Sequence, residues 1–215
     1  MTMKKYTSMN NICFYLLCLF ALGACTPSAS RENFTKGMNS YLAKSGNLCL
    51  AKYDWPIDVP PEEFEIGSRN AVQMPVLQKL GLVSVSDISV KAKAGKKAVV
   101  TKIKRYQLTD DGKKFYLVRD SSSIAPNGNK ILHRGDFCVA KLSLDKIVAW
   151  DKPAVVNGRE ETTVSYTYTV DAAPWLQDAD AKRVFPMVDS VVQGARVAQL
   201  KERFVLSKDG WVAKD

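Results

Sequence analysis

The chain has 215 residues, with 31 lysines and arginines against 22 acidic residues, a net charge of +9 and a single histidine. This length holds one domain of ordinary size or two small ones. The sequence contains no Gly-x-Ser-x-Gly, no His-Glu-x-x-His and no phosphate-binding glycine loop, which excludes the familiar signatures of α/β-hydrolases, zinc proteases and nucleotide-binding proteins.

The first 24 residues have the pattern of a secretory leader. Residues 1–11 carry Lys4 and Lys5 and no acid, and an apolar run of 11 residues follows at 12–22. A run of this length is too short to cross about 30 Å of hydrocarbon as a helix. We therefore expect a signal peptide over residues 1–24. The alternative is a buried helix at the start of the domain.

The segment Leu22-Gly23-Ala24-Cys25 resembles the lipobox of bacterial lipoproteins. This resemblance implies that the Cys25 thiol is joined to diacylglycerol, that the leader is removed, and that residues 25–32 form a lipidated tether. Each buried methylene contributes about 0.8 kcal/mol, so two or three acyl chains anchor a protein durably. Position 26 is Thr and not Asp, which by the same resemblance implies sorting to the outer membrane, on its periplasmic face.

The remaining cysteines suggest a disulfide. Cys13 and Cys18 belong to the leader and Cys25 is assigned to lipid, which leaves Cys49 and Cys138. The periplasm is oxidising, so we expect these two cysteines to form a disulfide. The bridge would close a loop of about 90 residues and stabilise the folded protein by roughly 4 kcal/mol. The alternative is two separate buried thiols. With a bridge and one histidine, no His/Cys zinc site is available, and we expect no metal and no cofactor.

The N-terminal part, residues 33–119, reads as helices with a hairpin. Asn33 and Ser68 are predicted helix N-caps, and Thr109 is predicted to cap a short helical turn. The predicted elements are a helix at 33–46, a strand at 48–51, an extended proline-rich loop at 55–61, a helix at 68–80, and a hairpin of strands 82–90 and 99–109 joined around 94–97.

A polar segment at 120–130 is the best internal boundary, and residues 130–215 read as antiparallel sheet. The two parts form either separate domains or one continuous domain. The predicted elements are strands at 137–143, 146–150, 162–170 and 203–206, a helix at 178–192 bent at Pro186, and a final turn after which 211–212 pair back. The fold class is therefore α+β: helices with a basic β-hairpin, then an antiparallel strand meander, one late helix and a closing strand.

Two stretches carry further resemblances. Residues 76–83 (VLQKLGLV), the basic hairpin and residues 106–113 (YQLTDDGK) resemble the helix-wing-helix segment of winged-helix proteins, which implies helix-hairpin geometry. The predicted location of the protein is the periplasm, which contains no chromosome, so we expect no nucleic-acid partner. Residues 106–114, together with Phe137-Cys138, also resemble proteobacterial lipoproteins that carry no established activity.

The predicted hairpin holds most of the excess positive charge. Its seven cations against the single acid Asp87 give +6, and the chain without its leader carries +7. The cations are Lys91, Lys93, Lys96, Lys97, Lys102, Lys104 and Arg105. One interpretation is a contact with anionic headgroups, worth about 1 kcal/mol per cation. The other is a solvated hairpin whose lysines prevent pairing between sheet edges.

Other side chains give weaker signals. His133 lies in a polar, loop-like context and is predicted to be a surface residue, not a catalytic base. The aromatic residues Trp55, Trp150, Trp175 and Trp211 lie in or beside apolar segments. We therefore expect them in the core, the alternative being a groove for lipid, glycan or peptide.

These patterns predict a membrane-anchored periplasmic lipoprotein that acts as a binding or scaffolding module of the cell envelope. The expected contacts are the membrane, through lipidated Cys25, and anionic lipid, lipopolysaccharide or an envelope protein. We expect no catalysis by the chain itself and identify no catalytic residue. The alternative is an envelope enzyme that acts on cell-wall or lipid substrates through a site that these motifs do not show.

Overall fold

The computed structural model describes residues 27–94 and 97–214, and it describes the side chains of these residues except 92–94 and 97–99. The helices are α1 (Arg31–Ser45), α2 (Pro61–Glu65), α3 (Arg69–Lys79), α4 (Asp110–Lys113), the 3₁₀ helix η1 (Pro174–Gln177), α5 (Ala179–Val184) and α6 (Pro186–Gln193). The strands are β1 (Asn47–Cys49), β2 (Ile57–Val59), β3 (Val83–Ala94), β4 (Lys97–Leu108), β5 (Tyr116–Ile124), β6 (Lys130–Trp150), β7 (Ala154–Val156), β8 (Arg159–Ala172), β9 (Leu200–Ser207) and β10 (Gly210–Ala213).

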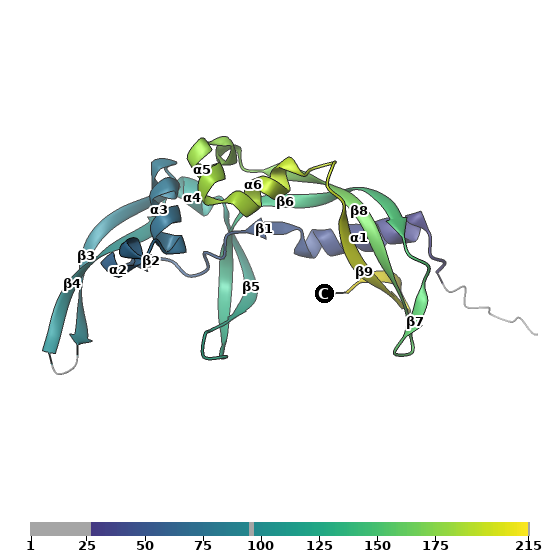
Figure 1. Ribbon diagram of the computed structural model, residues 1–215, viewed down its shortest axis with the longest axis horizontal. Coiled ribbons are helices and arrows are strands. Elements are labelled where there is room, and N and C mark those ends of the chain that lie inside the picture. The colour runs from purple at the N-terminus through teal and green to yellow at the C-terminus, as the bar shows by residue number, and fades with distance from the viewer. Residues whose placement is uncertain (1–26, 95–96, 215) are drawn as a thin grey trace, which may run out of the picture.

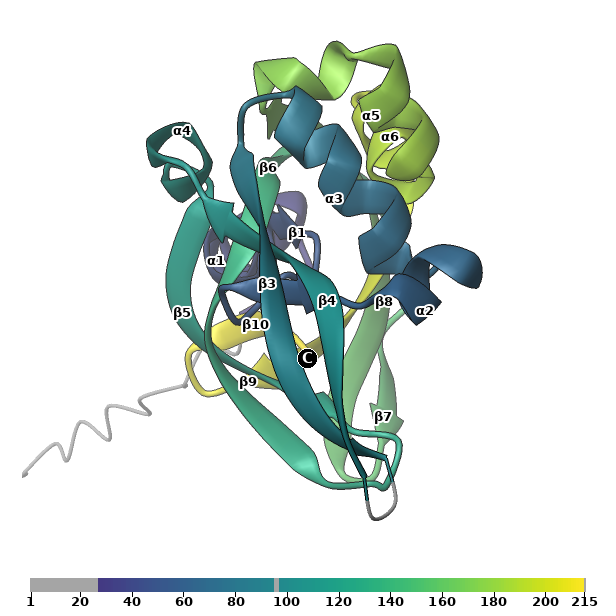
Figure 2. The same cartoon turned by 90° about the vertical axis from the view of Figure 1, so that its left-hand side faces the viewer.

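The strands form two antiparallel sheets, which confirms the α+β class. The larger sheet has the order β1-β6-β8-β9-β10, with β5 paired to β6 and β7 paired to β8. The smaller sheet has the order β2-β4-β3. Three hairpins (β3–β4, β5–β6 and β7–β8) project to the same side of an elongated molecule, whereas α3, α5 and α6 lie on the opposite side (Figures 1 and 2).

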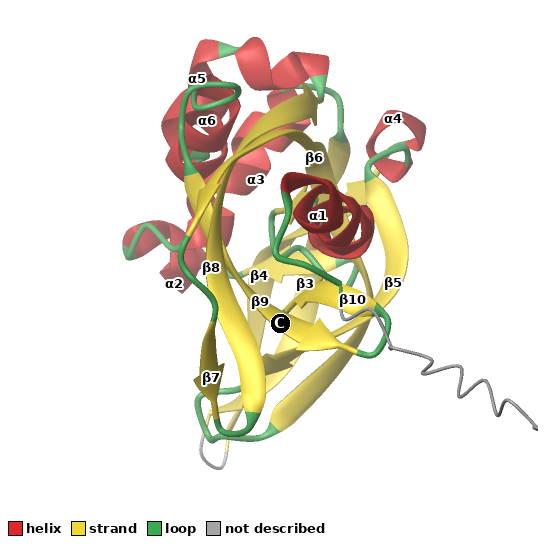
Figure 3. Cartoon of the chain, turned by 90° about the vertical axis from the view of Figure 1, so that its right-hand side faces the viewer, coloured by secondary structure: helices red, strands yellow, loops and turns green. Residues whose placement is uncertain are grey.

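Two hydrophobic clusters hold this shape, and β6 passes through both. The first cluster lies beneath α3, α5 and α6 and includes Leu77, Tyr106 and Phe137. The second lies between α1 and the sheet and includes Phe34 and Phe204. Figure 3 shows α1 against this end of the sheet. A 21-residue strand reaches both clusters because it rises about 3.3 Å per residue.

The polar segment predicted as a boundary is part of a hairpin. Residues 120–124 continue β5, and β6 begins at Lys130, so only the turn at 125–129 lies outside the strands. Both clusters also combine residues from before and after this turn. Polar side chains are compatible with strand here because much of this hairpin faces solvent.

Several helix ends differ from the predicted ones. The N-cap of α1 is Ser30, whose hydroxyl accepts from the Asn33 N–H, so the helix starts earlier than predicted and shortens the expected tether at 25–32. The late helix is two helices separated at Phe185, because Pro186 lacks an N–H and starts a new helix at N1. Ser68 and Thr109 cap α3 and α4 as predicted.

Strand β8 shows the predicted alternation. Val164, Tyr166 and Tyr168 are buried in the second cluster. Because side chains on a strand point alternately to opposite faces, these three share the face that α1 covers. The sequence pattern therefore predicted correctly which face of β8 is buried.

Candidate functional site

The predicted disulfide forms at the first strand pair. Cys49 in β1 lies opposite Cys138 in β6, and the two are bonded. The bridge ties the segment after α1 to the middle of β6, next to buried Phe137. Cys25, the predicted lipidation residue, lies outside the described residues, two positions before the first of them.

The basic residues of the β3–β4 hairpin are arranged by strand alternation. Lys91 in β3 lies opposite Val100 in β4, so these two share a face of the hairpin. Lys102 lies two residues after Val100 in β4 and therefore points to the same face. All three are exposed. Within the described residues, neither lysine has a carboxylate within ion-pair distance. The backbone of Lys93 and Lys97 is described but their side chains are not, and Lys96 lies outside the described residues.

The other two cations of the hairpin are paired with acids. Lys104 Nζ lies 3.2 Å from Asp87 Oδ1. Arg105 donates two hydrogen bonds of 2.7 Å to the carboxylate of Asp58, which joins β4 to β2. The hydrogen bond from Arg105 lowers the pKa of Asp58 and raises that of the guanidinium. These two cations therefore have less charge available for a partner than Lys91 and Lys102.

The other two projecting hairpins carry exposed apolar side chains. Val118 on β5 is 77% exposed, Leu132 on β6 is 76% exposed and Val155 on β7 is 75% exposed. Lys130 and Arg134 on β6 are also exposed. We call the side of the molecule to which the three hairpins project the three-hairpin face. Its exposed side chains, which come from both faces of the hairpin strands, are Lys91, Val100, Lys102, Val118, Ile124, Lys130, Leu132, Arg134, Val155 and Val156.

A second constellation surrounds the single histidine. The sequence predicts His133 on the surface, and this is wrong: the side chain is only 5% exposed. Its Nδ1 lies 2.9 Å from Asp54 Oδ2, and its Nε2 lies 2.8 Å from Ser123 Oγ. Both ring nitrogens thus have partners, one from the loop after β1 and one from β5.

The hairpin register creates this arrangement. Ser121 lies directly opposite His133, and Ser123 lies two residues further along β5, on the same face. The ring of Tyr53 stacks on the imidazole at 3.9 Å between centroids. The Tyr116 hydroxyl donates to the Tyr53 carbonyl at 2.6 Å, which fixes the segment that carries Asp54. Burial raises the pKa of Tyr116, so this hydroxyl keeps its proton.

Sequence reasoning missed this group because its members are 79 and 10 residues from His133. A run of three serines opposite a lone histidine was a weak signal, and it required the register of β5 against β6. Ser121 adds a further feature: its Oγ is buried and, within the described residues, has no hydrogen-bond partner.

A buried lysine lies beside this loop. Lys52 is 1% exposed, and its Nζ donates to Asn70 Oδ1 at 2.7 Å. Burial, reinforced by repulsion from Arg69, lowers the pKa of Lys52 to about 8. Its backbone N–H donates to Asp136, a carboxyl whose own pKa is raised by burial.

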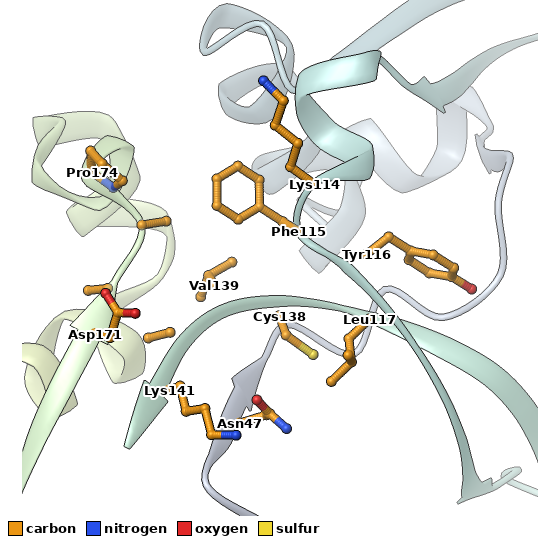
Figure 4. A pocket seen from close by; sticks show the side chains of 13 residues that line it. Asn47, Lys114, Phe115, Tyr116, Leu117, Cys138, Val139, Lys141, Asp171 and Pro174 are labelled. Carbon is orange, nitrogen blue, oxygen red and sulfur yellow. The ribbon is translucent and has the colours of Figure 1, made fainter. Parts of the chain in front are cut away.

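A pocket of about 400 Å³ lies where β1, β6 and β8 meet the end of α4 (Figure 4). Phe115 and Val139 line it, and Lys141 and Asp171 stand at one side. Asp171 is the single carboxylate among the described residues that line this pocket. The pocket lining therefore lacks the pair of carboxylates that acid–base hydrolysis of cell-wall glycans requires.

The four tryptophans pack into the two clusters. Trp211 is buried in the second cluster, and Trp150 packs against it. Trp55 and Trp175 pack against the first cluster. The structure therefore confirms the expectation that these rings belong to the core.

No group of three or more His, Cys, Asp or Glu side chains in the described part of the chain is placed to hold a metal ion. Over the same residues, no helix is both long and apolar enough to cross a membrane. The chain matches no known protein family, no curated protein and no solved structure.

Proposed function

We propose that the protein is a lipid-anchored module of the cell envelope that rests against an anionic lipid surface through its three-hairpin face. The lipobox-like segment ending at Cys25 supports the anchor. The Cys49–Cys138 disulfide supports export, because disulfides persist in oxidising compartments. The lipid surface would be the periplasmic leaflet of the outer membrane.

The observation that carries this proposal is the common direction of the three hairpins (Figures 1 and 2). Each projects away from the helical side. Among the described residues, the hairpins present cations that have no carboxylate within ion-pair distance beside apolar side chains. Apolar residues flanked by lysine and arginine are typical of surfaces that insert shallowly between anionic headgroups. The exposed Val118, Leu132 and Val155 would otherwise remain in contact with water.

The short connection to the anchor also supports a position close to the lipid surface. The Trp211 indole N–H donates to the Pro27 carbonyl at 3.1 Å, so the chain is attached to the body at the first described residue. Only Thr26 lies between Pro27 and Cys25, and the two residue steps from Pro27 to Cys25 span at most about 7 Å. An acylated Cys25 would therefore hold the body close to the lipid surface.

Vesicle binding tests the proposal. A soluble, Cys25-less form should sediment with phosphatidylethanolamine vesicles that contain phosphatidylglycerol, and more weakly at high salt. The double variant Lys91→Ala/Lys102→Ala should weaken binding by on the order of 2 kcal/mol, or roughly 30-fold in Kd, since each cation contributes about 1 kcal/mol. A parallel series with lipid A distinguishes lipopolysaccharide from phospholipid.

The matched control removes the same charge elsewhere. Lys182 and Arg183 lie on α5, on the opposite side of the molecule, and Lys182→Ala/Arg183→Ala should bind vesicles as the unaltered protein does. Equal loss in both double variants would indicate attraction by net charge alone. Binding that neither variant changes would contradict the proposed face.

A further inference from the structure

We propose that Ser123, His133 and Asp54 form an acyl-transfer site in which Ser123 is the nucleophile and carboxylic esters are the substrates. The contacts within this group are those of a serine, base and carboxylate relay: Ser123 Oγ is 2.8 Å from Nε2 of His133, and Asp54 Oδ2 is 2.9 Å from Nδ1. In this arrangement the carboxylate bound to Nδ1 fixes the imidazole tautomer, and Nε2 is left to accept the proton of the serine.

The surroundings hold the base in one orientation. His133 is 5% exposed and stacked on Tyr53, so its ring cannot rotate without breaking two hydrogen bonds and a ring contact. The neighbouring Tyr116 fixes the backbone carbonyl of Tyr53, and thereby the segment that carries Asp54. An oriented base of this kind is what activates a serine hydroxyl, which is a weak nucleophile by itself.

The reaction proceeds in two balanced steps. Ser123 Oγ attacks the ester carbonyl carbon as its proton passes to His133 Nε2; the bond to the alcohol oxygen then breaks, and the departing alcohol takes that proton. Water next adds to the acyl-serine and gives its proton to the same nitrogen. The acid leaves, and the proton returns to Ser123 Oγ.

The side chains around the nucleophile indicate the substrate class. Ile131 lies opposite Ser123 in the register, so the two share one face of the hairpin, and the Ile131 side chain is 43% exposed. An exposed apolar side chain beside the nucleophile fits an ester with an apolar acyl chain. The Asp54 side chain is 72% exposed, so water screens its charge, and we expect slow turnover.

A fluorophosphonate probe on the full acylated chain in detergent micelles tests the site. The probe should label Ser123, identified by peptide mapping, with loss of fluoride. Ser123→Ala should abolish the label, His133→Gln should slow it at least 100-fold, and Asp54→Asn at least tenfold. The matched control Ser122→Ala removes the neighbouring hydroxyl, which lies on the other face of β5, and should label at the original rate. Release of p-nitrophenol from p-nitrophenyl butyrate should follow the same order.

Three results would overturn the site: no label on correctly folded protein, a label on another residue, or labelling of Ser123 at an unchanged rate in His133→Gln. Folding is checked by the mass of the disulfide-linked peptides and by the melting temperature. Vesicle binding should be the same for Ser123→Ala and the unaltered protein, so this inference and the proposed membrane contact succeed or fail separately.

Discussion

At the scale of single residues, burial gives two polar side chains properties that their sequence context did not suggest. His133 lies between the exposed residues Leu132 and Arg134 in the chain, yet three aromatic or polar groups from other segments enclose it. Lys52 directly follows a short predicted strand, yet its ammonium is enclosed and hydrogen-bonded to an amide, not to a carboxylate. In both cases the environment is supplied by residues far away in the chain.

Lys52 should make stability depend on pH. Its folded-state pKa of about 8 lies below the usual 10.5, so between these values the unfolded chain binds more protons and stability rises with pH. The free energy of unfolding should increase by about 2 kcal/mol from pH 7 to pH 9.5 because of this residue. Urea titrations at several pH values measure it.

The comparison variant for that experiment is Lys52→Met, which should lose this rise. Lys36→Met removes an exposed lysine of α1 and should keep it. A rise of the same size in Lys52→Met would show that another group is responsible.

At the scale of elements, close contact between α1 and the last hairpin depends on a glycine. A methyl group at Gly37 would overlap the Trp211 backbone carbonyl and come within 2.8 Å of the Phe204 ring. Phe34 and Met38 of the same helix are fully buried, so α1 cannot shift outward without opening the second cluster.

Gly37→Ala should therefore destabilise the protein by about 1–3 kcal/mol, the usual cost of overpacking, even though alanine is the better helix former. Thermal unfolding measures the change. Ser40→Ala on the exposed side of α1 serves as the control and should be within about 0.5 kcal/mol of the unaltered protein. A more stable Gly37→Ala protein would mean that α1 packs less tightly than the structure has it.

At the scale of the whole molecule, β6 and the disulfide together join the two clusters. Strand β6 contributes Phe137 to one cluster and Ile147 to the other. The bridge holds β1, and with it the C-terminal end of α1, to the middle of that strand. Such connections matter in an elongated molecule (Figure 1), because its buried apolar residues form two separate clusters and not a single core.

Removing the bridge in Cys49→Ala/Cys138→Ala should cost roughly 4 kcal/mol, because the sequence separation of 89 residues leaves a long loop free in the unfolded chain. Denaturant unfolding of the variant measures the loss of stability. The unaltered protein should lose the same amount of stability under reducing conditions. Equal stability of oxidised and reduced protein would contradict this role.

The sequence by itself determined the features that rest on local patterns. The alternation in β8, the caps at Ser68 and Thr109, the β3–β4 hairpin and the antiparallel α+β class all follow from neighbouring residues. The cysteine count predicted the disulfide by elimination. Such features can be predicted from the sequence because propensity, capping and periodicity act over a few neighbouring positions.

Only the tertiary structure decided the rest, because those features depend on the register between segments far apart in the chain. The pairing of β5 with β6 converted a polar segment into a hairpin and placed Ser123 beside His133. Hydrogen bonding from a distant loop added Asp54. The common direction of the three hairpins likewise follows from the packing of two sheets, and no pattern within a single hairpin encodes it.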